Sequence, residues 1–151
     1  MNDAYLQKIS EHPFLKGLSP KHLKRVSELA MSVQFQPGQI IFKTGDPANR
    51  FYLIQSGKVV LRAPGSAQDI QVIGPGDVLG WSWLFEPYHW QFDAIALESA
   101  WSVFIYATGL REACDADPDL GYELLKRCTC VVIERLHATA QKLLKESSKA
   151  L

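Results

Sequence analysis

The side chains best suited to bind a ligand gather in one aromatic segment, residues 80–93. Gly80 lets the backbone approach a ligand closely, and the Ser82 hydroxyl can form a hydrogen bond with it. Aromatic walls with a few polar groups are typical of pockets for planar or apolar molecules. The segment therefore predicts a small-molecule pocket. Six of its fourteen residues are aromatic and could line that pocket: Trp81, Trp83, Phe85, Tyr88, Trp90 and Phe92.

These aromatic side chains could instead fill the space themselves. Burial of a large aromatic side chain contributes roughly 2–3 kcal/mol, which favours a plugged site over an empty one. Packing, in part against the long C-terminal helix described below, is the favoured role for Trp83, Phe85 and Phe92. For the other three aromatic residues, lining a ligand site and packing remain about equally open.

Positive charge is scarce in this part of the sequence. No Lys or Arg occurs between Arg62 and Arg111, which leaves His89 as the one titratable cation of the segment. An unperturbed imidazole has a pKa near ~6.5 and is mostly neutral at pH 7. A phosphate taken out of water costs several kcal/mol unless cations and hydrogen bonds compensate it. We therefore expect phosphorylated ligands to bind this segment weakly.

The elements that would position the segment are mostly short strands. Between residues 31 and 106, β-rich runs alternate with turn residues such as Pro37-Gly38 and Ser56-Gly57. Strands of this length and spacing favour an antiparallel sandwich or roll over βαβ units. The expected strands cover residues 31–36, 39–43, 51–55, 58–62, 69–73, 94–98 and 101–106, and a helical insert over 80–92 interrupts them once.

Helices are expected on both sides of the strands. Ser19 can cap a helix that begins at Pro20, and Asp117 and Pro118 repeat this arrangement before a long helix that runs to about residue 145. The 151 residues suffice for one domain with a buried core. That domain, residues 1–151, would comprise N-terminal helices over about 3–30, a β roll over about 31–107 and C-terminal helices over about 108–146.

The order of these elements and several motifs resemble the cyclic nucleotide-binding domain family. The first half of that fold is similar to residues 35–42, Gly45-Asp46 and residues 51–59. Residues 74–80, Gly-Pro-Gly-Asp-Val-Leu-Gly, look like the approach to its phosphate-binding cassette. Residues 135–142 are similar to the helix that covers the pocket and pairs subunits in bacterial catabolite activator-type regulators. The resemblance covers residues 10–146 and implies a mainly β fold, an eight-stranded β roll of the jelly-roll type with flanking helices.

The same resemblance implies a degenerate binding site. In the family, backbone N–H groups of the insert bind a cyclic phosphate, an acid after the glycine binds the ribose, and an Arg pairs with the phosphate. Trp81 stands at the position of the acid, and Trp90 or Gln91 at that of the Arg. The implied ligand is cAMP, cGMP or another small molecule, with weak or absent affinity for the first two. The candidate ligand-binding residues are Gly80, Trp81, Ser82, Trp83, Leu84, His89, Trp90, Gln91 and Thr139.

The long C-terminal helix predicts a homodimer. Four residues at close to seven-residue spacing would form an apolar stripe on it, and a parallel two-helix pairing would bury this stripe. Packing of the whole stripe within a monomer is the alternative. The proposed dimer interface consists of Leu125, Val132, Leu136 and Leu143.

Other functions find little support in the sequence. Lys plus Arg and Asp plus Glu number sixteen each, and no helix-turn-helix pattern follows the long helix, so direct DNA binding is not expected. No apolar run suits a membrane span or a signal peptide, which predicts a cytoplasmic protein. The four histidines are scattered singly, and Cys114, Cys128 and Cys130 suit reduced thiols in helices better than a metal site.

The sequence also lacks the elbow, Walker and dinucleotide motifs of common enzymes. We therefore expect a non-catalytic regulatory sensor that needs no cofactor or metal and acts on a signalling protein in trans. A ligand-free dimeric scaffold, with its pocket filled by its own aromatic side chains, is the alternative.

Overall fold

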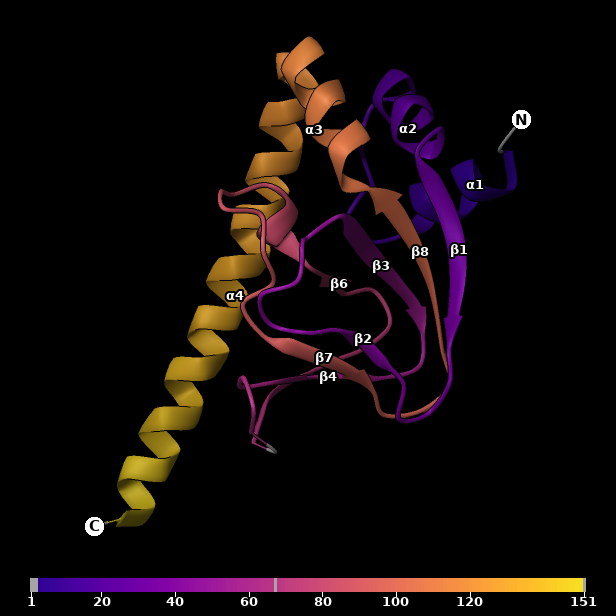
Figure 1. The fold of residues 1–151 in the computed structure, drawn as a ribbon. Coiled ribbons are helices and arrows are strands. Elements are labelled where there is room, and N and C mark those ends of the chain that lie inside the picture. The colour runs from indigo at the N-terminus through magenta and orange to yellow at the C-terminus, as the bar shows by residue number, and fades with distance from the viewer. Residues whose placement is uncertain (1–2, 67, 151) are drawn as a thin grey trace.

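Eight strands form two four-stranded antiparallel sheets in the computed structural model of the chain, which describes residues 3–66 and 68–150 (Figure 1). The strand orders are β1-β8-β3-β6 and β2-β7-β4-β5. The β roll predicted from the sequence is therefore confirmed. The strands are β1 (Ala30–Phe35), β2 (Ile40–Phe42), β3 (Arg50–Ser56), β4 (Val59–Arg62), β5 (Asp69–Ile73), β6 (Val78–Leu79), β7 (Asp93–Ala96) and β8 (Ala100–Tyr106).

In the part of the chain that the structure describes, four α-helices flank the roll, and α4 runs along one side of it and continues beyond it toward the C-terminus (Figure 1). The Ser19 hydroxyl accepts a hydrogen bond from the His22 N–H at 3.3 Å, and the Asp117 carboxylate accepts one from the Leu120 N–H at 3.5 Å. Both predicted N-caps are thus present. The helices are α1 (Asp3–Glu11), α2 (Pro20–Ser27), α3 (Ala107–Ala116) and α4 (Pro118–Ala150).

The insert contains much less helix than the sequence indicated. It forms one 3-10 turn, η1 (Trp81–Trp83), between Gly80 at φ 97° and an irregular segment in which Tyr88 has φ 59°. Pro87 has no N–H to donate and disfavours a helical conformation at the residue before it. The rest of the insert is tied to the loop before β3 instead, for example through the Trp90 N–H and the Asp46 carbonyl oxygen at 3.0 Å.

Two apolar cores lie on opposite faces of β3. Alternate side chains of a strand point to opposite faces, so Phe51 and Leu53 join the core under the helices, whereas Tyr52 and Ile54 join the core between the sheets. The insert contributes one tryptophan to each core, Trp83 to the first and Trp90 to the second. Two separate packing interactions therefore hold the insert on the roll.

Candidate functional site

A cavity of about 230 Å³ lies where the insert meets the roll and α4. It brings together five of the nine residues predicted to bind a ligand: Gly80, Trp81, Ser82, Trp90 and Gln91. The remaining lining residues come from the strands, the end of the insert and α4. They are Phe42, Leu61, Leu79, Phe92 and Arg135.

The other four candidate residues lie outside this lining. Trp83 is 0% exposed and packs against Phe51 at 5.6 Å between ring centroids, and Leu84 packs against the same core. His89 is exposed, and its carbonyl oxygen accepts a hydrogen bond from the Gln91 amide. Thr139 is also exposed, and its hydroxyl donates to the Arg135 carbonyl oxygen of the preceding helical turn at 2.9 Å.

Trp90 fills the space between Gly80 and Phe42. Its ring stacks on Phe42 with centroids 3.9 Å apart and planes 10° apart, and the residue is 4% exposed. A Cβ atom built on Gly80 would lie 2.5 Å from Cζ3 of this ring. The close approach that Gly80 permits is therefore taken up by the indole of the same insert.

The remaining aromatic residues of the insert lie at the cavity or near the surface, outside both cores. Phe92 lines the cavity from its half-buried position, and Tyr88 lies under the Arg111 guanidinium at 4.2 Å. Phe85 was expected to pack but is 46% exposed. The Tyr88 N–H bonds to the Phe85 carbonyl oxygen at 2.9 Å and closes a turn at the edge of the molecule. Phe85 therefore stays outside both cores.

Arg135 supplies the cavity with the positive charge that the insert lacks. Its guanidinium carbon lies 4.8 Å from the centroid of the Trp81 ring, and its Nη2 donates a hydrogen bond to the Val78 carbonyl oxygen of β6. The expectation that the site has almost no countercharge is thus wrong for the cavity, although it holds for the insert sequence. A periodic signal was available, because Arg135 follows the buried Cys128 by two helical turns.

The surroundings of Arg135 change the pKa of its guanidinium. Burial lowers the pKa of the guanidinium to about 10, while the nearby carboxylates of Asp77 and Glu134 act in the opposite direction. The group remains protonated at neutral pH. Among the described residues, no Asp or Glu lines the 230 Å³ cavity; Asp77 and Glu134 line a neighbouring groove, which Arg135 also borders.

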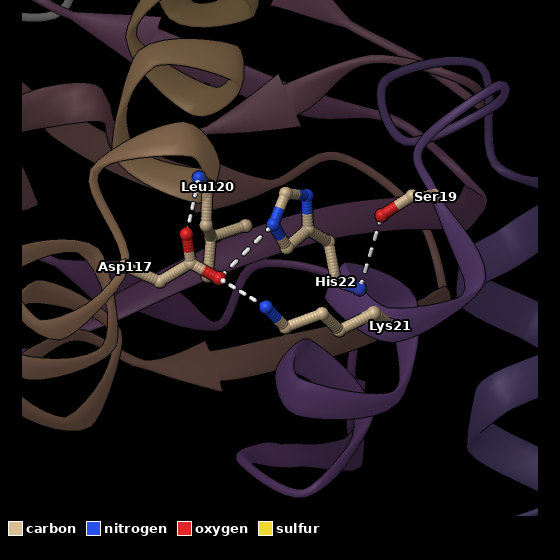
Figure 2. Close-up of polar contacts among 5 residues, drawn as sticks. All are labelled: Ser19, Lys21, His22, Asp117 and Leu120. Carbon is tan, nitrogen blue, oxygen red and sulfur yellow. Dashed lines mark hydrogen bonds and ion pairs between the residues drawn. The ribbon is translucent and has the colours of Figure 1, made fainter.

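A Ser, a His and an Asp also come together between α2 and α4, but they form a structural clamp (Figure 2). The Asp117 carboxylate lies 3.1 Å from His22 Nε2 and 3.5 Å from Lys21 Nζ. Ser19 accepts a hydrogen bond from the backbone N–H of His22 and not from its ring, so the three residues do not form a nucleophile–imidazole pair. Desolvation acts to raise the pKa of Asp117, yet the Leu120 N–H, Lys21 and His22 together lower it.

The cysteines lie in the helices, where they were expected. Burial raises the pKa of Cys114 to about 11 and that of Cys128 to about 12, so both thiols stay protonated at neutral pH. Within the described ranges, no three or more His, Cys, Asp or Glu side chains gather into a group that could hold a metal ion. In the same ranges, every helix is too short or too polar to cross a bilayer.

The chain belongs to the cyclic nucleotide-binding domain family, whose model matches residues 32–117. It is 28% identical over 131 residues to a CRP-like cAMP-activated global transcriptional regulator of Mycobacterium tuberculosis, covering 85% of this chain and 57% of that protein. It is 29% identical over 80 residues to a cAMP-dependent protein kinase regulatory subunit of Emericella nidulans, covering 53% and 19% of the two chains. The chain thus spans at most 57% of these relatives.

A solved structure agrees with this assignment over almost the whole fold. A provisionally assigned cyclic nucleotide-binding protein of Geobacter metallireducens GS-15 superposes with a TM-score of 0.81 at 27% identity. The match covers 87% of this chain and 97% of that one. The family resemblance noted from the sequence is therefore confirmed, and the relatives named above are regulators by their own descriptions.

Proposed function

We propose that the protein is a non-catalytic regulatory module that senses a small ligand in the cavity between the insert and α4. One observation carries this proposal: Trp81 and Ser82 of the insert and Arg135 of α4 line the same cavity. A ligand that binds there touches both elements. It can therefore favour one position of α4 over another, as long as its affinity for the two positions differs.

We further propose weak or absent affinity for cAMP and cGMP. The cavity of about 230 Å³ is smaller than the roughly 300–1,000 Å³ of typical ligand pockets. The ring of Trp90 packs where a phosphate would approach Gly80, and Trp81 offers no carboxylate to a ribose hydroxyl. A cyclic nucleotide would have to displace Trp90 from Phe42, and that rearrangement would reduce its apparent affinity.

The output of this module would be a homodimer formed through α4 that acts on a signalling protein in trans. Three of the four predicted interface residues leave large apolar side chains exposed, and Val132 is half-buried between them. An apolar stripe of this kind is what two parallel helices bury against each other. The exposed members are Leu125, Leu136 and Leu143. Direct DNA binding is not part of the proposal, because the net charge of the chain is zero.

The Phe42–Trp90 stack favours a second candidate function, a dimeric scaffold that binds no ligand. In that case the indole would replace the ligand permanently, and α4 would present its partner surface in a single conformation. The two candidates differ in whether any small molecule changes the behaviour of the protein.

Calorimetry with cAMP, cGMP and cyclic dinucleotides, together with mass spectrometry of molecules that copurify, tests the proposal. We expect no submicromolar binding of cAMP or cGMP. We also expect either a molecule that copurifies or a compound that binds more weakly, and Trp81→Ala or Arg135→Gln should abolish its binding. Submicromolar binding of cAMP would contradict the predicted weak affinity. If no compound binds and no molecule copurifies, the result would favour the scaffold.

A further inference from the structure

The lining of the cavity is mainly aromatic and aliphatic and carries one full charge among its described residues. The polar groups are the Ser82 hydroxyl, the Gln91 amide and the Arg135 guanidinium. A pocket of this kind derives affinity from its apolar walls and orientation from its few polar groups. From this arrangement we propose that the ligand is a flat monoanion, specifically an aromatic carboxylate. The inference rests on the proposed function, because it names the ligand class of that same cavity.

The charge of the lining favours a single negative group. Arg135 provides one guanidinium and no carboxylate stands in the described lining, whereas the nearby Asp77 and Glu134 of the adjoining groove disfavour a second negative group. A guanidinium forms two parallel N–H···O bonds with a carboxylate, which matches it in shape as well as in charge. A neutral ligand of the same shape would lack this pairing and would leave Arg135 with only its present contacts.

The guanidinium already has contacts, and these define what a ligand must do. One N–H donates to the Val78 carbonyl oxygen and the carbon lies over Trp81, but a guanidinium has five N–H donors. A carboxylate can therefore bind while the ring contact with Trp81 is kept. If the ligand draws Arg135 away from Val78, it also removes one hydrogen bond between α4 and β6, and binding is then coupled to the position of α4.

The size and walls of the cavity favour a flat ligand. A cavity of about 230 Å³ has room for one or two aromatic rings but falls below the usual range for larger ligands. Trp81, Trp90 and Phe92 are the aromatic residues of the insert that line it. Aromatic pairs prefer offset or edge-to-face arrangements with centroids about 4.5–7 Å apart, so a planar ring system can contact several of these walls together.

A matched pair of probes separates charge from shape. Indole-3-acetate carries a carboxylate, whereas indole-3-acetamide has nearly the same outline without the charge. We expect calorimetry with the whole chain to show at least tenfold tighter binding of the acid. Arg135→Gln should bring the ratio of the two affinities close to one, and Arg135→Lys should retain part of the preference, because an ammonium keeps the charge but not the planar fork.

Two controls keep the result interpretable. Arg25→Gln makes the same chemical change at a residue of α2 that pairs with Glu28 and does not line the cavity, and it should leave the ratio unchanged. Thermal unfolding of each variant verifies that it is folded. If Arg135→Gln does not fold, Arg135→Lys alone still tests the preference, with an expected decrease of several-fold in the ratio.

Equal binding of the acid and the amide, or a preference that survives Arg135→Gln, would overturn the ligand class. The proposed sensor function would nevertheless survive if a copurified molecule or a cyclic nucleotide bound in a Trp81-dependent manner. Failure of both probes, of all cyclic nucleotides and of the search for a copurified molecule would contradict the sensor function together with this inference.

Discussion

Gly80 and Trp90 depend on each other at the wall of the cavity. Gly80 has φ 97°, and the nearest Trp90 ring atoms would lie 2.5 and 2.6 Å from an added Cβ. We expect Gly80→Ala to lower the free energy of unfolding by about 2–5 kcal/mol, since it combines left-handed backbone strain with overpacking. Urea denaturation measures this change.

Gly38→Ala is the matched control for that substitution. Gly38 has φ 83°, and no atom lies within 4 Å of its added Cβ, so only the backbone strain of about 1–2 kcal/mol is expected. The double variant Gly80→Ala/Trp90→Ala should be less destabilised than the sum of its single variants, because removal of the ring removes the clash. Additive losses would show that the ring and Gly80 are not coupled.

His12 is expected to make stability depend on pH. It is buried, its Nε2 lies 3.1 Å from the Ile54 carbonyl oxygen, and its Nδ1 accepts a hydrogen bond from the Phe14 N–H. Burial lowers the pKa of this imidazole, against the smaller opposing effects of backbone hydrogen bonds and Asp77. The folded protein then binds fewer protons at His12 than the unfolded chain does. The contribution of His12 to the free energy of unfolding is therefore fully present above about pH 6.5 and is lost as the pH falls below that value.

Urea unfolding of the native protein and His12→Gln at pH values from 5 to 8 tests this effect. Below about pH 6.5, the free energy of unfolding should fall more steeply with decreasing pH in the native protein. The difference in slope should correspond to at most one bound proton. The other three histidines are present in both proteins, so the difference between the profiles isolates His12. Parallel profiles would contradict the assignment.

The residues of the site could be predicted from the sequence only where they are close together along the chain. Gly80, Trp81 and Ser82 lie together because they are consecutive, and the aromatic content of the insert marked its packing role. The choice between lining and packing for Trp90 was beyond the sequence, because it depends on the distant Phe42. Arg135 was missed as a site residue although its helical spacing from Cys128 offered a signal, because its contact with Val78 spans 57 positions of the chain.

At the scale of elements, Asp117 joins α4 to α2 (Figure 2). It caps α4 through the Leu120 N–H and pairs with Lys21 and His22. Asp117→Asn keeps an oxygen that can cap the helix but loses the charge, whereas Asp117→Ala loses both. We expect the urea midpoint to decrease from the native protein to Asp117→Asn and again to Asp117→Ala.

Each interval in that order tests a different contact. Equal midpoints for Asp117→Asn and Asp117→Ala would show that the cap contributes nothing. Equal midpoints for the native protein and Asp117→Asn would show the same for the ion pairs. High salt should reduce the difference in urea midpoint between the native protein and Asp117→Asn, because salt screens exposed ion pairs but does not weaken a helix cap.

The sequence predicted both caps and every described strand except the two-residue β6, because their signals are local. Turn glycines, alternating apolar residues and Ser-Pro or Asp-Pro pairs act within a few positions of the elements they define. The insert was misjudged, because Pro87 and the backbone bonds to residues 45–48 replace helical bonds that its composition allowed. Helix α3 runs over ten residues, and packing against α4 and β8 supports it.

At the scale of the whole molecule, the exposed stripe on α4 predicts self-association. Leu136 is 63% exposed and lies near the middle of the stripe. A Glu at this position would place a charge in the apolar interface, which is costly without a partner. We expect the native protein to sediment as a dimer and Leu136→Glu to weaken association on the order of 100-fold.

Gln141→Glu is the control for that substitution. Gln141 is exposed and lies about 140° around the helix from Leu136 by the 3.6-residue period, away from the stripe. It should add the same charge without changing the sedimentation of the dimer. A native protein that sediments as a monomer would contradict the dimer prediction, and equal effects of the two variants would place the interface elsewhere.

The division of the two insert tryptophans between separate cores has a consequence for how binding specificity can evolve. Trp83 anchors one end of the insert independently of Trp90, so a smaller residue in place of Trp90 would enlarge the cavity without detaching the segment from the roll. Single substitutions at one position could thus yield descendants with differently sized binding sites on an unchanged scaffold.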